Sequence, residues 1–226
     1  MILDERLTTY MNSLAKDNTE ALQEIEREAL DTFVPIIRKE TQEYLKLMLS
    51  IVKPKRILEV GAAVGFSSIL MATYNPVDCT IDTIENYEPR IPIAKANFIR
   101  ASLDDRITLY EGDAMEILPK LEGPYDFIFM DAAKGQYPLF FPHIRPLMHS
   151  GTVMITDNVL QDGDILESHF AVVKRNRTIH KRVRDYLYEL SKDEDFVFDL
   201  LPIVQQADGA EYHGKEQHEN VDKVAL

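Results

Sequence analysis

The stretch Ile57-Leu-Glu-Val-Gly61-Ala-Ala-Val-Gly65-Phe-Ser-Ser68 decides how this chain is interpreted. A compact apolar run of strand type leads into a loop with two glycines, and a helical segment follows. Glycine lets a backbone approach a ligand closely, and the start of a helix offers free N–H groups. The stretch therefore predicts a strand, a ligand-binding turn and a helix, although a glycine turn can also be purely structural.

Two further segments repeat the pattern of an apolar run that ends in polar residues: Phe127-Ile-Phe-Met-Asp131-Ala-Ala-Lys134 and Val153-Met-Ile-Thr-Asp157-Asn158. Apolar runs at 56–60, 80–85, 107–111, 127–130 and 153–156 alternate with helical patterns near 66–74, 89–102, 114–120 and 136–148. This alternation predicts an α/β fold with a mainly parallel sheet flanked by helices. In such a sheet, ligands bind where the strands end at their carboxyl edge.

The chain divides into three regions. Residues 1–52 are predicted to form an N-terminal helical extension, 53–203 the α/β domain, and 204–226 a polar, loose tail. A last helix is expected at 178–191, and Phe196–Leu201 could form a sixth strand. The alternative for the tail is that Val221–Leu226 supplies a short closing strand.

Composition limits the cellular setting. The 226 residues are 45% hydrophobic and carry a formal net charge of −13, so most of the surface should repel nucleic acid and anionic membranes. Cys79 is the single cysteine, which excludes an intrachain disulfide. The N-terminus lacks the features of a signal peptide, and no run approaches the roughly 20 apolar residues of a membrane span. We expect a cytoplasmic protein that does not enter a membrane.

The first three strand ends suggest a nucleotide-like cofactor. Glu85 ends the second apolar run about 20 residues beyond the glycine loop, where an acidic side chain would accept both hydroxyls of a ribose. Gly112-Asp113-Ala114 ends the third run and can face a purine, and Glu59 and Ser67 lie close to the loop. Glu85 would also suit an NAD-dependent oxidoreductase, but the G-x-G-x-x-G fingerprint of that class is absent.

The remaining strand ends suggest a metal site. Asp131, Asp157 and Asn158 supply three oxygen ligands with no cysteine or histidine nearby, which favours Mg²⁺, Ca²⁺ or Mn²⁺ over zinc. The alternative is that Asp157 and Asn158 only cap a turn. Lys134 lies three residues past Asp131. It is either a solvated surface lysine or a general base, since a nearby cation favours its neutral form.

Residues 172–184 differ from the rest of this acidic chain. They hold six of its 25 basic residues and none of its 38 acidic ones. Such a run is usually a solvated face. A basic patch just after the predicted metal ligands is better explained by a polyanionic substrate. A non-catalytic RNA-binding module is a further alternative, but it leaves Lys134 and the acidic cluster unexplained.

These motifs, taken together over about residues 30–202, resemble the cation-dependent class I O-methyltransferases that use S-adenosylmethionine, the group that contains catechol and caffeoyl-CoA methyltransferases. The resemblance implies a Rossmann-like methyltransferase fold for residues 53–203. Within the group, Asp157–Gly163 and the basic run from Lys174 look most like the bacterial tRNA 5-hydroxyuridine methyltransferases. Ala133 departs from the pattern, because many relatives carry an acidic residue there.

The resemblance also implies a role for each matched position. Cofactor contacts would come from Ile36, Glu59, Gly61, Ala62, Ser67, Glu85, Asp113, Ala114 and Asp131. Asp131, Asp157 and Asn158 would bind Mg²⁺, with Asp131 and Lys134 as the catalytic pair and Lys134 as the base. Contacts to tRNA would come from Lys174, Arg175, Arg177, Lys181 and Arg182.

The reaction implied is methyl transfer from S-adenosylmethionine to the 5-hydroxyl of 5-hydroxyuridine at the tRNA wobble position, which gives 5-methoxyuridine. A metal that binds this hydroxyl and the neighbouring carbonyl oxygen would lower the hydroxyl's pKa. The alternative substrate is a small catechol-like phenol, which would not need the basic run. The resemblance and the long helical N-terminus further predict a homodimer.

Overall fold

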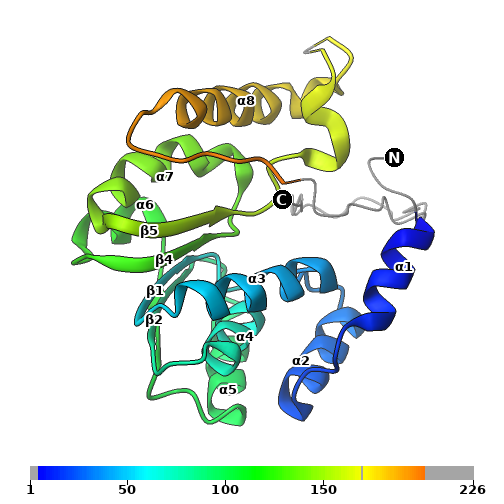
Figure 1. The fold of residues 1–226 in the computed structure, drawn as a ribbon, viewed down its shortest axis with the longest axis vertical. Coiled ribbons are helices and arrows are strands. Elements are labelled where there is room, and N and C mark those ends of the chain that lie inside the picture. Colours follow the sequence, from blue (N-terminus) through cyan, green and yellow to red (C-terminus); the bar gives the residue numbers. More distant parts are fainter. Residues whose placement is uncertain (1–4, 169, 202–226) are drawn as a thin grey trace.

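The computed structural model describes residues 5–168 and 170–201. Within them, five parallel strands form a single sheet in the order β3-β2-β1-β4-β5 (Figure 1). The strands are β1 (Arg56–Val60), β2 (Thr80–Glu85), β3 (Ile107–Glu111), β4 (Tyr125–Met130) and β5 (Met148–Thr156). The chain order reverses between β1 and β4. In open parallel sheets, the crevice at such a reversal is where ligands bind.

Helices cover both faces of the sheet, so the molecule has three layers (Figure 1). One face packs against α2, α3, α4 and α5, and the other against α6, α7 and α8. The helices are α1 (Glu5–Leu14), α2 (Glu20–Asp31), α3 (Lys39–Val52), α4 (Phe66–Tyr74), α5 (Ile91–Arg100), α6 (Ala114–Ile117), α7 (Tyr137–Ile144) and α8 (Arg177–Lys192). Short 3₁₀ turns occur at Leu118–Lys120, Lys134–Gln136, Arg145–Leu147, Gln161–Leu166 and Lys174–Asn176.

Alternating side chains of the strands explain why both faces are apolar. On β1 and β4, Ile57 and Phe127 join the core under α2–α5, while Leu58 and Ile128 join the core under α6–α8. Strands buried on both faces appear in sequence as continuous apolar runs rather than alternating ones, as the runs here do. The expected parallel α/β sheet is thus confirmed, and each of the five expected strands is present.

The expected sixth strand at Phe196–Leu201 is wrong. Residues 193–201 have no strand pairing with any described residue. Their backbone N–H groups bond locally instead, since Asp195 N donates to Asp193 Oδ1 (3.1 Å) and Leu200 N to Asp199 Oδ1 (2.8 Å). Val197 is fully exposed, while Phe198 packs against the core under α6–α8. The expected tail at 204–226 and the alternative closing strand lie outside the described residues.

The N-terminal region is helical, as expected: α1, α2 and α3 occupy it, and α8 covers the helix expected at 178–191.

Among the described residues, no helix combines the length and the apolar character that crossing a membrane requires.

Candidate functional site

The strand ends stand side by side because backbone hydrogen bonds continue the sheet by one residue past each strand. Asp131 N donates to Val60 O (2.9 Å), and Asp157 N donates to Met130 O (2.8 Å). On the other side, Gly61 N donates to Ile84 O (3.0 Å) and Gly112 N to Glu85 O (2.9 Å). The residues that follow β3, β2, β1, β4 and β5 therefore share one edge in that order, as the sequence predicts.

The two glycines of the first loop are required by the backbone. Gly61 has φ +105°, and a Cβ there would lie 2.0 Å from the carbonyl oxygen of Asp131. Gly65 has φ +81°, and a Cβ there would lie 2.4 Å from the Phe98 ring. Only glycine fits such positions without strain. Because Gly61 carries no side chain, the β1 loop can lie directly against the β4 loop.

Glu85 is buried and holds the glycine loop through its carboxylate. Oε2 accepts the N–H of Ala63 and Oε1 accepts the N–H of Tyr87, both at 2.7 Å. Each carboxylate oxygen has two lone pairs, so both retain capacity to accept ribose hydroxyls. Glu85 thus lies where it can fix the loop and a bound cofactor together.

Glu59 lies below the loop, in the core under the first turn of α4. Its side chain is fully buried, and it accepts hydrogen bonds from Ser68 and from Thr83 Oγ1 (2.5 Å). Burial raises the pKa of this carboxyl above its ordinary value, and the hydrogen bonds from the Ser68 and Thr83 hydroxyls oppose that shift. The described contacts of Glu59 support α4, and its contact with a cofactor stays a prediction.

The other predicted cofactor positions lie around the loop. Asp113 is exposed and caps α6, with Oδ1 accepting the N–H of Met115 (2.8 Å). Ala114 is buried, and Ala62 and Ser67 lie buried in and after the glycine loop. Ile36 lies in the connection between α2 and α3 and is half-buried against the core under α2–α5.

The oxygen donors of the predicted metal site come from the two loops after β4 and β5. Asp131 and Asn158 are half-buried, and Asp157 is only 3% exposed. Asn158 has φ +77°, a left-handed conformation that asparagine tolerates better than most residues. No three His, Cys, Asp or Glu side chains converge among the described residues, and the predicted donor set consists of two carboxylates and one amide. Such a set fits a hard divalent cation.

Tyr137 joins these two loops, which sequence reasoning missed. From sequence, the near-helical spacing of Tyr137, Phe140 and Phe141 makes core packing the default interpretation. The buried hydroxyl oxygen of Tyr137 lies 3.0 Å from the carbonyl oxygen of Ala132 and 3.0 Å from that of Asp157. Burial raises the pKa of Tyr137 well above its ordinary value, and the Asp131 and Asp157 charges add to the shift. The usable signal was that a buried tyrosine hydroxyl needs a partner.

Lys134 begins the short 3₁₀ turn that precedes α7, and its side chain is half-buried. The next residue, Gly135, is held from α8, because Arg182 Nη1 donates to the Gly135 carbonyl (3.2 Å). Ala133, the position that departs from the family pattern, is exposed. The loop that carries the predicted base, Lys134, is thus held at Asp131 by the sheet and at Gly135 by Arg182 of α8.

The basic side chains of residues 172–184 divide into two groups, of which the first consists of those that bond to backbone or to a carboxylate of this protein. Arg177 donates to the carbonyls of Val172 (3.1 Å) and Phe170 (3.0 Å), and Arg184 to those of Ile165 and Glu167. With Arg182, these guanidinium groups hold backbone within the protein. Lys181 pairs with Asp185 on the surface of α8.

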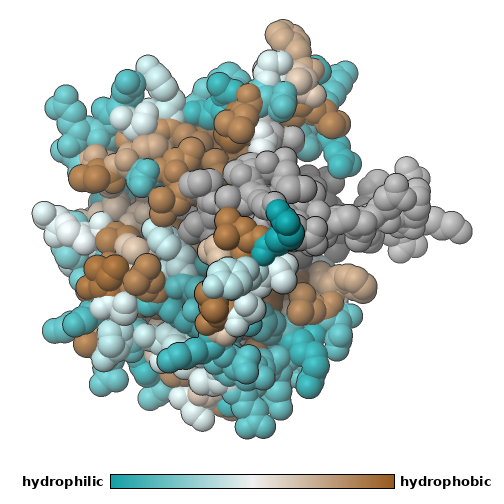
Figure 2. Space-filling view, turned by 45° about the vertical axis from the view of Figure 1, so that its right-hand side comes forward, coloured by the Kyte–Doolittle hydropathy of each residue, from teal (hydrophilic) through white to brown (hydrophobic). Residues whose placement is uncertain are grey.

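Lys174 and Arg175 form the second group. Both side chains are exposed in the 3₁₀ turn before α8. Leu166, Phe170 and Val173 are exposed close to them in sequence. In Figure 2, the top of the molecule accordingly shows hydrophobic atoms beside hydrophilic ones. This exposed tip combines cationic and apolar groups.

Comparison with known proteins agrees with this geometry. The chain matches the profile of a family described as O-methyltransferase over residues 12–209. It is 31% identical over 172 residues to a catechol O-methyltransferase of Niastella koreensis, covering 73% of this chain and 77% of the relative. It is 29% identical to a caffeoyl-CoA O-methyltransferase of Medicago sativa, covering 71% and 68% of the two chains.

A solved structure shows the same arrangement of the chain. The O-methyltransferase from Bacillus cereus, crystallised in complex with SAH, superposes with a TM-score of 0.73 at 26% identity and covers 84% of this chain and 86% of its own. The family profile spans the sheet, the glycine loop, and the loops after β4 and β5 that carry Asp131 and Asp157. The chain therefore belongs to the O-methyltransferase family.

Proposed function

We propose that this protein is an S-adenosylmethionine-dependent O-methyltransferase that uses a divalent cation and methylates 5-hydroxyuridine at the tRNA wobble position. The observation that carries the proposal is the shared edge of the sheet. There, a glycine loop with Glu85 and Asp113 adjoins the oxygen donors Asp131 and Asp157. The resemblance to an enzyme crystallised with SAH supports the choice of cofactor.

In the proposed site, the residues after β1, β2 and β3 bind and orient the cofactor. The glycine loop admits its methionine portion, and Glu85 accepts its ribose hydroxyls. Asp113 and Ala114 contact the adenine. These residues fix the direction in which the methyl group points, and alignment with the acceptor oxygen contributes much of the rate of such a transfer.

The residues after β4 and β5 hold the acceptor. Asp131, Asp157 and Asn158 would hold Mg²⁺, which when bound polarises two neighbouring substrate oxygens. Lys134 takes the proton from the acceptor hydroxyl. The acceptor oxygen then bonds to the methyl carbon while the bond from that carbon to the cofactor sulfur breaks. Tyr137 is buried beneath the two loops and helps to keep water out from below.

The exposed tip supports a tRNA acceptor. Lys174 and Arg175 can approach phosphates, and the exposed Phe170 ring is a surface on which an unpaired base can stack. A specific observation favours the second candidate, a small catechol-like phenol. Arg177, Arg182 and Arg184 already donate to backbone carbonyls, so fewer cations of the run remain for phosphate than the sequence suggests.

The test is methyl transfer from labelled S-adenosylmethionine to hydroxylated tRNA and to catechol, with and without EDTA. We expect tRNA to be the better acceptor, EDTA to stop transfer, and added Mg²⁺ to restore it. Asp157→Ala should abolish turnover while calorimetry still detects cofactor binding. Asp105→Ala, in an exposed turn at the opposite edge of the sheet, is the control. Full methyl transfer in EDTA would contradict the requirement for a divalent cation. A higher rate with catechol than with tRNA would contradict the tRNA assignment.

A further inference from the structure

We infer that Tyr137 is a positioning residue whose hydroxyl holds together the two loops that carry the metal donors. The inference rests on the proposed function, because it concerns the same cation. It goes beyond the donors themselves, since Tyr137 contacts the backbone of both loops rather than the cation. Three features support it: the position of the hydroxyl, the way its ring is held, and the charge of the loops it joins.

The hydroxyl lies between the loops at hydrogen-bonding distance from each. Tyr137 is the first residue of α7 and is fully buried. Its Oη lies 3.0 Å from the carbonyl oxygen of Ala132, directly after Asp131, and 3.0 Å from the carbonyl oxygen of Asp157. A phenol has one proton to donate. That proton is therefore shared between two acceptors, one on each loop, and holding it requires both loops to stay in place.

The ring itself is fixed from α8. The ring centroid of Tyr137 lies 6.1 Å from that of Tyr186, and both side chains are buried. The Tyr186 hydroxyl in turn lies 3.0 Å from Thr156 Oγ1, at the end of β5. Buried side chains in a close-packed core have little freedom to move away. The Tyr137 hydroxyl is thus a fixed point against which the two loops are set.

Charge explains why the loops need such a link. Asp131 and Asp157 lie on neighbouring loops, and both carboxylates are close enough to Tyr137 to act on it. Two like charges repel each other until a cation lies between them. A neutral hydroxyl that adds no charge but holds both backbones sets the donor spacing before the cation arrives. Groups of this kind behind a metal site change metal affinity by about 10–100-fold when they are removed.

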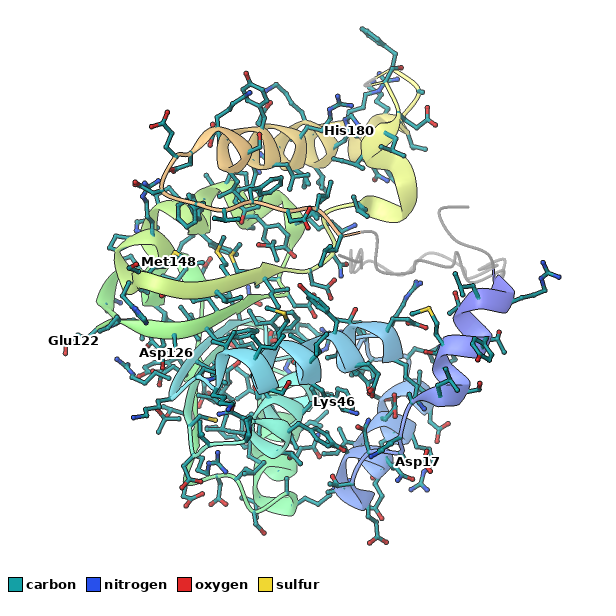
Figure 3. All side chains as sticks on the ribbon, in the orientation of Figure 1. Asp17, Lys46, Glu122, Asp126, Met148 and His180 are labelled. Carbon is teal, nitrogen blue, oxygen red and sulfur yellow. The ribbon has the colours of Figure 1, made fainter. Side chains whose placement is uncertain are left out.

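The experiment compares Tyr137→Phe with a matched variant, Tyr125→Phe. Tyr125 is also buried, and its hydroxyl donates to Asp82 Oδ2 (2.7 Å). Tyr125 lies next to Asp126 at the amino end of β4. Figure 3 labels Asp126 at the end of the strands opposite the edge that carries the site. Both substitutions remove one buried hydroxyl and keep the ring. Mn²⁺ binding is measured by the loss of the free-ion electron paramagnetic resonance signal, with no methyl donor or acceptor present.

We expect Tyr137→Phe to weaken Mn²⁺ binding by about 10-fold or more. Tyr125→Phe should bind Mn²⁺ like the unmodified protein, and S-adenosylmethionine affinity should change little in either variant. In activity assays, excess metal should restore most of the Tyr137→Phe turnover, because the defect is in affinity. Circular dichroism and thermal unfolding check that both variants fold, and Tyr137→Leu is a second variant without the hydroxyl if Tyr137→Phe does not fold.

Unchanged Mn²⁺ affinity in Tyr137→Phe, with binding lost in Asp157→Ala, would show that Tyr137 only packs and would overturn the inference alone. Equal losses in Tyr137→Phe and Tyr125→Phe would also overturn it, because the effect would then be general destabilisation. A wild-type protein that binds no Mn²⁺ overturns the proposed metal function, and the inference with it.

Discussion

At the residue scale, Glu59 carries a conflict between solvation and hydrogen bonding. Two hydroxyls, those of Ser68 and Thr83, donate to its Oε2, while its Oε1 is buried with no hydrogen-bond partner among the described residues. A buried carboxylate is costly when its oxygens are not all satisfied. Burial accordingly raises the pKa of Glu59 above its ordinary value of 4.5. The folded state therefore favours the protonated carboxyl.

This conflict predicts how stability depends on pH. Because the folded-state pKa lies above the unfolded one, folding binds a proton. The contribution of Glu59 is most favourable below 4.5 and becomes less favourable as the pH rises through its raised pKa. Glu59→Gln should remove this dependence and increase the free energy of unfolding at neutral pH.

Urea unfolding between pH 5 and 8 would measure that change, with Glu116→Gln on the exposed surface of α6 as the control. If Glu59→Gln were less stable than the unmodified protein at every pH, the ionised carboxylate would be a stabilising group, which contradicts the prediction. Calorimetry on the same variant would also test the predicted cofactor contact, since loss of S-adenosylmethionine binding in a stable protein would place Glu59 in the site.

The residues of the edge could be predicted from sequence because each one follows an apolar run. Parallel strands end at the same edge, so Asp131 and Asp157 had to lie near each other once the strands were recognised. Tyr137 could not be found in this way. Its role depends on where the hydroxyl points in three dimensions, and its spacing fits ordinary helix packing equally well.

At the scale of elements, contacts that depend on the folded chain explain why the sixth strand was wrongly predicted and why the basic run was not resolved into separate groups. Phe196–Leu201 has strand-like composition, but the carboxylates of Asp193 and Asp199 accept nearby backbone N–H groups, and the segment has no regular secondary structure. The basic run was predicted as one patch. Half of its six basic side chains are arginines that donate to backbone carbonyls of this protein, which only the folded chain reveals. Composition cannot distinguish a cation that binds a ligand from one that binds backbone.

Helix α1 leads to a prediction about assembly. Leu7, Tyr10, Met11 and Leu14 recur at helical spacing and are 44–67% exposed, and Figure 1 shows α1 at the outer edge of the molecule. An apolar helix face of this kind is typical of an interface. We propose that the protein is a homodimer in which this face is covered by a second copy.

Light scattering of the variant Tyr10→Asp/Leu14→Asp tests the assembly. We expect a dimer for the unmodified protein and a monomer for the variant, because two buried charges without partners destabilise an interface strongly. Tyr188→Asp, a similarly exposed tyrosine on α8, should leave the dimer intact. A monomeric unmodified protein contradicts the dimer, and a dimeric variant excludes this face.

At the scale of the whole molecule, the balance of charge sets the problem that a tRNA substrate must overcome. The chain has a net charge of −13, so RNA is repelled by most of its surface. Arg177 is held by the carbonyls of Val172 and Phe170, and replacing it would disturb the tip itself. Lys174 and Arg175 are exposed and lie just before α8, the helix that also holds the Lys134 loop. They are the cations whose removal tests the substrate most directly.

Lys174→Ala/Arg175→Ala should raise the tRNA KM and reduce its dependence on salt. Each phosphate contact contributes about 0.7–0.9 to the slope of log K against log salt concentration, so losing two should lower that slope by about 1.5. Catechol methylation, if present, should not change, because a neutral small substrate needs neither contact.

Lys53→Ala/Lys55→Ala is the control, because it removes the same charge from exposed side chains at the opposite edge of the sheet and should leave the slope unchanged. If both double variants methylate tRNA with the same slope as the unmodified protein, the tip is a solvated surface and the small phenol becomes the better acceptor. If both slopes fall equally, RNA responds only to net charge, and the tip does not hold it.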